Sequence, residues 1–220
     1  LLLSLVPAVL RAEVTRVEIT SRTAVADGAA FGSVGPYEQL SGKIYFSVDP
    51  ANTRNRVIVD LEKASKNERG RVEMAADLAI FKPKDSTRGN GVTLLDVVNR
   101  GNKTVISGFN RSGGGNEVGD GLLMRMGYTI VWVGWEFDVA QRNGAIRIDV
   151  PAATGTTGIA RAFLTPASNS ATAQFGDAAG YTPSDTASPQ NALTVRNGSL
   201  GSPPLVPRNK WTLNGNTVTL

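Results

Sequence analysis

The strongest hydrophobic pattern lies in the middle of the chain. Val92–Val98 and Gly127–Trp135 are nearly continuous apolar runs rich in branched side chains. Such runs are typical of strands buried on both faces, as in a parallel sheet covered by helices. Between them, apolar residues recur at helical spacing over Val118–Met126, with a glycine placed to end the helix. Because parallel strands need a connection of about a dozen residues or more, residues 99–126 predict one right-handed βαβ unit.

The preceding part of the chain predicts strands joined by short links without a helix. Alternating polar and apolar positions, or short apolar runs, mark Val14–Val25, Gly42–Pro50, Val57–Leu61 and Val72–Asp85. Strands in this order favour an antiparallel or mixed sheet. The charged turn Lys63–Arg71 is expected to be a solvated hairpin tip.

The last third of the chain has a different character. A short strand is expected over Ala145–Val150, and residues 151–220 are rich in Ala, Ser, Thr, Gly and Pro. This composition predicts an insertion or lid-like segment outside the core, with a disordered linker as the alternative. Gly158–Ala167 and Tyr181–Arg196 could each supply an edge strand. Asn214-Gly215 between two β-prone runs indicates a hairpin.

The amino-terminal segment Leu1–Ala12 is apolar, too short to span a bilayer, and contains small residues near its end. It predicts the remnant of a secretory signal peptide, followed by a folded part over residues 13–150. This interpretation implies a secreted or periplasmic protein without a membrane span after cleavage. A buried first strand or helix is the alternative. The amino end of the chain is expected to be a cut because only a remnant of the signal peptide is present. The carboxyl end is expected to be a cut because the final hairpin stops in its second arm.

Composition narrows the chemistry. The net charge is +4 and the isoelectric point about 9.6, but Lys and Arg are scattered, so no nucleic-acid partner is expected. The 220 residues include no Cys, which excludes disulfides, zinc-thiolate sites and thiol nucleophiles. They include no His either, which excludes a complete Ser-His-Asp or Cys-His constellation within this chain. No resident cofactor or metal is expected, and no oligomeric state is predicted.

Two motifs suggest chemistry that their spacing does not support. The Gly-rich segment Ser112–Gly121 matches neither the dinucleotide fingerprint nor the Walker pattern, so a loop that caps a helix is the preferred interpretation. The segment Asn197–Gly201 approaches G-x-S-x-G, but Asn197 stands where the first Gly belongs. It also lacks the strand and helix that an esterase elbow requires, and it is rejected as a nucleophile.

Two pairs of acidic residues are further candidates for functional carboxylates. Glu117 and Asp120 are placed to favour a first helical turn through its dipole. Glu136 and Asp138 follow a strand end, where a solvated or hydrogen-bonded role is expected. Neither pair has the further ligands that a metal site needs.

The loop directly after the first buried strand is the preferred functional candidate. It consists of Asn99, Arg100, Gly101 and Asn102. In an α/β-hydrolase the loop between the third strand and the first helix donates a backbone N–H to the oxyanion hole. The order of elements predicts an α/β fold: the amino-terminal half of an α/β-hydrolase sheet, with an antiparallel or mixed β meander, one βαβ unit and a β-rich insertion. The loop would form the oxyanion side and one substrate wall.

Several motifs resemble a known family. The segments GPYEQLSGKIYFSVDP, LEKASKNERGRVEMAADLAIFKPKD, VNRGNK and MRMGYTIVWVGWEFDV are similar to the amino-terminal half of bacterial exported "alpha/beta hydrolase domain" proteins. The resemblance covers roughly residues 14–150. It implies an esterase-like serine hydrolase acting on a small-molecule carboxylic ester, with nucleophile, acid and His in a carboxyl half that this chain does not contain. The chain would then supply scaffold and the oxyanion-side loop, and be inactive alone.

Two other functions stay open from the residues. The first is a non-catalytic β-rich accessory module for carbohydrate or cell wall, based on the Ser/Thr/Asn-rich second half and on aromatics such as Trp211, which are expected to be exposed. The second is a dinucleotide- or phosphate-binding enzyme, based on the Gly-rich segment.

Overall fold

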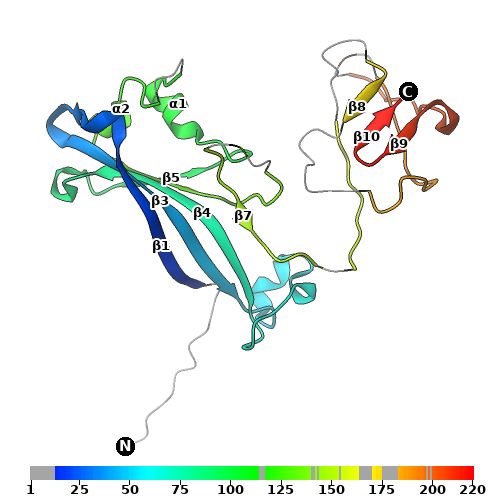
Figure 1. Cartoon of the computed structure of the whole chain (residues 1–220), viewed down its shortest axis with the longest axis horizontal. Coiled ribbons are helices and arrows are strands. Elements are labelled where there is room, and N and C mark those ends of the chain that lie inside the picture. Colours follow the sequence, from blue (N-terminus) through cyan, green and yellow to red (C-terminus); the bar gives the residue numbers. More distant parts are fainter. Residues whose placement is uncertain are drawn as a thin grey trace, which may run out of the picture. The chain divides into compact units, whose positions relative to one another are not determined.

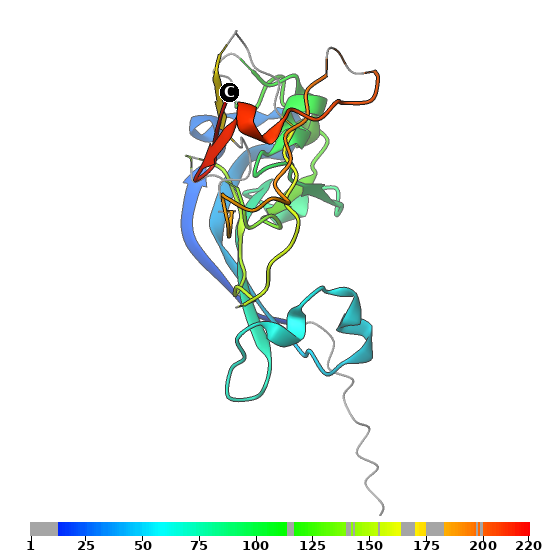
Figure 2. The same cartoon turned by 90° about the vertical axis from the view of Figure 1, so that its right-hand side faces the viewer.

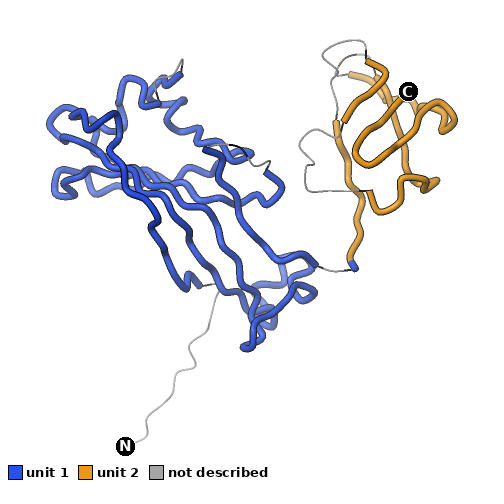
Figure 3. Tube along the Cα trace, viewed as in Figure 1, with its two compact units in different colours: residues 1–155 blue, residues 156–220 orange. Residues whose placement is uncertain are grey.

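A computed structural model describes residues 13–113, 117–139, 142, 144–153, 155–163, 170–174, 183–196, 198 and 200–220. The expected signal-peptide remnant Leu1–Ala12 lies outside these residues, as do parts of the Gly-rich segment and of the two expected edge strands. The chain divides into two compact units, residues 1–155 and residues 156–220 (Figure 3). Each unit is described by itself.

A seven-stranded sheet forms the framework of the first unit (Figure 1). Its strands are β1 (Glu13–Ala24), β2 (Ala30–Phe31), β3 (Gly35–Val48), β4 (Val72–Pro83), β5 (Thr93–Val97), β6 (Thr129–Val133) and β7 (Ile148–Asp149). The main order is β1-β3-β4-β6-β5, while β2 pairs with β3 and β7 with β4. Every pairing is antiparallel except that of β5 with β6.

Helical structure is sparse in the described residues. The α-helices are α1 (Thr104–Asn110) and α2 (Leu122–Arg125), both between β5 and β6, and the 3-10 turns are η1 (Val25–Gly28), η2 (Gly32–Val34), η3 (Thr53–Val57), η4 (Leu61–Lys63), η5 (Ser86–Arg88) and η6 (Arg208–Lys210). The expected α/β class is wrong: the unit is a β-rich, mainly antiparallel sheet with one parallel pair. With seven and four residues, α1 and α2 are too short to form the helical layers that cover an α/β sheet.

The main core lies where the sheet meets α1 and α2. Trp132 and Tyr37 are almost completely buried. Trp132 packs edge-on against Phe81 with ring centroids 5.0 Å apart, and Tyr37 packs in the same way against Phe31 at 5.5 Å. The Tyr37 hydroxyl donates to the Tyr128 carbonyl at 2.9 Å, so its one polar group is satisfied.

The expected strand Val57–Leu61 is wrong. The chain there forms η3, a turn and η4, and Val57 and Val59 are 84% and 85% exposed. The Asn52 side chain caps η3, and Asp60 adopts a left-handed conformation with φ of 58°. These local contacts oppose an extended run. Figures 1 and 2 place this region at the end of β3 and β4 away from α1 and α2.

The other expected strands in the first unit agree in part with the structure. β1 and β4 occupy the segments expected for them, whereas β3 begins at Gly35, seven residues before the expected strand Gly42–Pro50. Of Ala145–Val150 only β7 pairs with the sheet, through Ile148 and Asp149. Strand β5 is one edge of the sheet order, and its Leu95 and Val97 are 59% and 67% exposed. The expectation that Val92–Val98 is buried on both faces is therefore wrong.

The second unit contains a three-stranded antiparallel sheet, in the order β8-β10-β9, whose strands are β8 (Thr172–Gln174), β9 (Thr212–Asn214) and β10 (Thr217–Thr219). The Asn214-Gly215 hairpin is confirmed by the pairing of β9 with β10. The described part of Gly158–Ala167 is not a strand, and Ile159 is 99% exposed. None of the helices in the described parts of the chain has the length and apolarity needed to cross a membrane.

Gly42 gives a test of the sheet. A Cβ at this position would lie 1.8 Å from the Glu18 carbonyl oxygen of β1, so Gly42→Ala must push β1 from β3. We expect a loss of about 3 kcal/mol in the free energy of unfolding, measured by urea denaturation. Gly108 of α1 has open space around it, and Gly108→Ala should instead stabilise by about 0.5–1 kcal/mol. Equal stabilities of the two variants would contradict this close approach.

Glu38 predicts an acid-sensitive step. The hydrogen bond from Lys82 lowers the pKa of the Glu38 carboxyl below its ordinary 4.5, against the opposing effect of burial, and Arg22 adds to the lowering. A lowered folded-state pKa stabilises the fold above pH 4.5, and this stability is lost as pH falls through the folded-state value. The difference in unfolding free energy between the native chain and Glu38→Gln should therefore shrink in acid. A pH-independent difference would contradict this.

Candidate functional site

The Asn99–Asn102 loop is a tight two-residue turn. Arg100 and Gly101 both have positive φ, 50° and 77°, and Asn99 and Asn102 form an antiparallel bridge. The Asn102 backbone N–H donates to the Asn99 carbonyl at 3.0 Å, and its side-chain amide donates to the same oxygen at 2.8 Å. Positive φ at two successive positions is the backbone of a type I′ turn. Because Arg100 has a Cβ, this left-handed backbone conformation costs about 1 kcal/mol relative to glycine.

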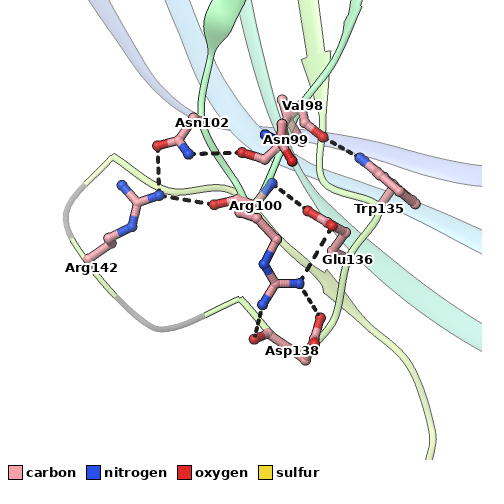
Figure 4. A network of polar contacts seen from close by, with 8 residues as sticks. All are labelled: Val98, Asn99, Arg100, Asn102, Trp135, Glu136, Asp138 and Arg142. Carbon is pink, nitrogen blue, oxygen red and sulfur yellow. Dashed lines mark hydrogen bonds and ion pairs between the residues drawn. The ribbon is translucent and has the colours of Figure 1, made fainter. Parts of the chain in front are cut away.

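Two carboxylates hold Arg100 in this conformation (Figure 4). Its backbone N–H donates to Glu136 Oε2 at 2.6 Å, and its Nη1 lies 3.5 Å from Glu136 Oε1. The same Nη1 donates to Asp138 Oδ1 at 2.7 Å, while Nη2 donates to the Asp138 carbonyl at 3.0 Å. The three side chains are 28%, 15% and 18% exposed, so partial burial strengthens these charge-assisted bonds.

The parallel pair of strands explains why these residues meet. The carboxyl ends of β5 and β6 lie at the same side of the sheet, because Val97 pairs in parallel with Val133. The Trp135 indole N–H donates to the Val98 carbonyl, which joins the two segments that leave these strands. The Arg100 contacts to Glu136 and Asp138 extend this connection.

Arg142 lies over the outer side of the turn. Its Nη2 donates to the Arg100 carbonyl at 2.9 Å and to Asn102 Oδ1 at 2.6 Å. The turn thus has acidic partners on the Arg100 side and a cation on the other (Figure 4).

The inner side of the turn packs against the chain beyond β6. The Ile146 N–H donates to the Gly101 carbonyl at 3.2 Å. A Cβ at Gly101 would lie 2.8 Å from Val139 Cγ1 and 3.1 Å from the Ala145 Cβ. Gly101 is therefore required both for its positive φ and for this close contact.

Asp96 is a partly buried polar anchor next to the loop that sequence reasoning missed. Its Oδ2 accepts hydrogen bonds from Trp132 Nε1 at 2.7 Å and from the Val105 N–H at 2.9 Å, which fixes the start of α1 against the sheet. The signal was a lone acid inside the apolar run Val92–Val98. Lys103 Nζ lies 5.7 Å from the centre of the Trp132 ring, and burial lowers the pKa of this amine.

The Gly-rich segment Ser112–Gly121 packs around a second missed residue, Asn110. The fully buried Asn110 side chain accepts from the Leu123 N–H at 3.0 Å and donates to the Val118 carbonyl at 3.1 Å. A Cβ at Gly119 would lie 1.9 Å from the Asn110 carbonyl oxygen. This glycine is therefore required for close packing. The helix that follows, α2, has only four residues, so its amino-terminal end is a poor site for a phosphate.

Three of the four acids in the predicted pairs have hydrogen-bonded partners within the ranges that the structure describes, but neither Glu117 nor Asp120 lies in the first turn of α2, so that expectation is wrong. Glu136 and Asp138 are hydrogen-bonded, as expected, and the Asp120 carboxylate accepts from the Leu122 N–H at 2.9 Å at the start of α2. Among the described residues, no group of three or more His, Cys, Asp or Glu side chains could hold a metal ion.

The loop has limited capacity as an oxyanion hole. The N–H groups of Arg100 and Asn102 already donate to Glu136 and to Asn99, so an oxyanion donor from this loop must be another amide. The expected role of Asn99–Asn102 stays a prediction. Trp211, expected to be an exposed aromatic, is buried beneath the Arg208 guanidinium, which lies 4.2 Å above its ring; that expectation is wrong.

Comparisons of this chain with protein-family models, with curated proteins and with solved structures find no match. The site is therefore interpreted from its own geometry. Its chemical capacity is that of a rigid, charged wall beside the ends of two parallel strands.

Glu136→Ala should loosen this wall. The variant removes the acceptor of the Arg100 N–H and one partner of its guanidinium, and leaves a partly buried donor unpaired. We expect a loss of about 1–3 kcal/mol in the free energy of unfolding and faster hydrogen exchange at the Arg100 amide. Glu136→Gln keeps an oxygen acceptor, so its Arg100 amide should exchange more slowly than in Glu136→Ala. Unchanged exchange in Glu136→Ala would show that the carboxylate does not hold the turn.

Proposed function

We propose that this chain supplies the non-nucleophilic part of an exported carboxylic-ester hydrolase, with the Asn99–Asn102 loop as one wall of the substrate site. The observation that carries the proposal is the turn at Arg100, strained and fixed by Glu136 and Asp138 where the parallel strands β5 and β6 end. Residues in sparsely populated backbone conformations cluster at functional sites, where the surrounding contacts hold them.

The chemistry of the residues supports a role in orienting the substrate, with the nucleophile and its base supplied elsewhere. Ester hydrolysis by a serine enzyme needs a nucleophile, a base to take its proton and donors for the oxyanion. The 220 residues contain no His to act as that base, whereas a fixed loop can orient a substrate. The similarity of VNRGNK and MRMGYTIVWVGWEFDV to exported "alpha/beta hydrolase domain" proteins supports the ester class. The nucleophile and His would come from residues other than these.

The accessory-module alternative has less support, because Trp211 is buried. A carbohydrate- or wall-binding module would bind its ligand without turnover in any polypeptide that carries this sequence. The two functions are therefore separated by activity.

The experiment compares two polypeptides in p-nitrophenyl acetate hydrolysis. The 220-residue chain should show no turnover above buffer, because it has no His to act as base. The complete polypeptide encoded by the same reading frame should hydrolyse the ester. In it, Glu136→Ala should lower kcat/KM by about tenfold through the loosened wall, and Glu68→Ala, at an exposed position, should not.

Turnover by the 220-residue chain would overturn the non-nucleophilic role. Absence of turnover in the complete polypeptide, on acetate and longer acyl esters alike, would overturn the hydrolase proposal and favour the accessory module.

A further inference from the structure

A charged cleft of about 260 Å³ lies on the first unit, behind the Asn99–Asn102 loop. It is lined by Lys43, Asp77, Val139, Arg142, Ala145, Arg147 and Asp149. Val139 and Ala145 are the same residues that pack against Gly101, so the cleft and the loop share a wall.

Ion pairs inside the cleft leave positive charge in excess. Lys43 Nζ lies 3.0 Å from Asp149 Oδ2 and 3.3 Å from Asp77 Oδ1, and Arg147 Nε lies 3.6 Å from Asp149 Oδ1. Two cations and two carboxylates thus balance. Arg142 is the third cation, and its hydrogen bonds within the described part of the chain go to neutral oxygens of Arg100 and Asn102. The side chains that line the cleft therefore sum to a charge of +1.

The Arg147 guanidinium is only weakly paired. Its Nε is buried and makes no hydrogen bond with any described residue, although its own backbone N–H donates to Asp77 Oδ2 at 3.0 Å. The nearest carboxylate oxygen, Asp149 Oδ1, lies 3.6 Å from this Nε, beyond hydrogen-bond distance. A guanidinium has five N–H donors, so a ligand oxygen would bind at the nitrogens other than the shielded Nε.

The position of Arg147 is fixed by the sheet. The Arg147 carbonyl accepts from the Asp77 N–H at 2.9 Å, and a Cβ on Gly134 would lie 2.2 Å from that carbonyl oxygen. The cleft is thus built on β-sheet backbone, which preorganises its charges for a ligand.

We propose that this cleft binds a small organic monocarboxylate. Planar guanidinium groups match the two oxygens of a carboxylate, and one negative charge balances the excess from Arg142. The small apolar side chains of Val139 and Ala145 suit a short alkyl group. The volume equals about nine waters, which limits the ligand to a small acid. A phosphate dianion would bring a second charge toward Asp77 and Asp149, so it should bind more weakly.

Calorimetric and NMR titrations of the 220-residue chain with acetate, butyrate and inorganic phosphate test this, at constant ionic strength. We expect butyrate to bind more tightly than phosphate. Arg147→Gln and Arg142→Gln should each weaken butyrate binding by about tenfold or more. Arg69→Gln removes an exposed charge away from the cleft and should bind as the native chain does. Circular dichroism checks that each variant is folded, and either arginine variant suffices for the comparison.

Absence of butyrate binding, or equal binding in the folded arginine variants and Arg69→Gln, would overturn the proposal. Tighter binding of phosphate would overturn the assignment to carboxylates. The inference does not depend on ester hydrolysis, because it concerns binding to this chain alone and is measured without turnover.

Discussion

The backbone of Asp77 is the point on which the first unit depends. One edge of β4 pairs with β3 along its whole length, but its other edge is divided between two partners. Leu78–Phe81 pair with β6, and Ala75 and Ala76 pair with β7. The partner of this edge changes at Asp77. The Asp77 N–H donates to the Arg147 carbonyl, and the Gly134 N–H donates to the Asp77 carbonyl, both at 2.9 Å. Both backbone groups of Asp77 are thereby paired.

This division of one strand edge also places the functional residues. Because β6 leaves the sheet at Gly134, Glu136 and Asp138 reach the turn at Arg100. Because β7 begins directly after Arg147, this residue lines the cleft together with Lys43. The charged wall and the cleft are therefore two sides of one backbone arrangement, and neither requires a helix layer.

The sequence predicted the positions of strands better than it predicted which elements pack on the faces of the sheet. Alternation over β1, β3 and β4 and the Asn-Gly hairpin were readable because strand periodicity and turn chemistry are local. The α/β class was wrong because an apolar run does not say what covers it. Here β6 packs against two short helices in a mainly antiparallel sheet, and the apolar run of β5 is an exposed edge. Val57–Leu61 failed because capping by Asn52 and a left-handed Asp60 overrode an apolar run.

The site was readable only in part. The position of Asn99–Asn102 after a strand was visible, but its ion pairs join residues more than thirty positions apart, which no local pattern encodes. Arg142 and Arg147 looked like ordinary surface charges, because their partners come from distant segments, the loop after β5 for Arg142 and Asp77 of β4 for Arg147. Asn110 gave no signal beyond its place at the end of a short helix.

The attachment of both Gly134 and Arg147 to Asp77 has a consequence for how this protein can vary. The chain between them is a loop whose two ends are both hydrogen-bonded to the backbone of Asp77. The entropy cost of closing such a loop changes only slowly with the number of residues in it. Residues could be added to or removed from that loop with little effect on the framework. The contacts to Arg100 and the lining of the cleft could thus diversify among descendants while β4 and its neighbours keep their register.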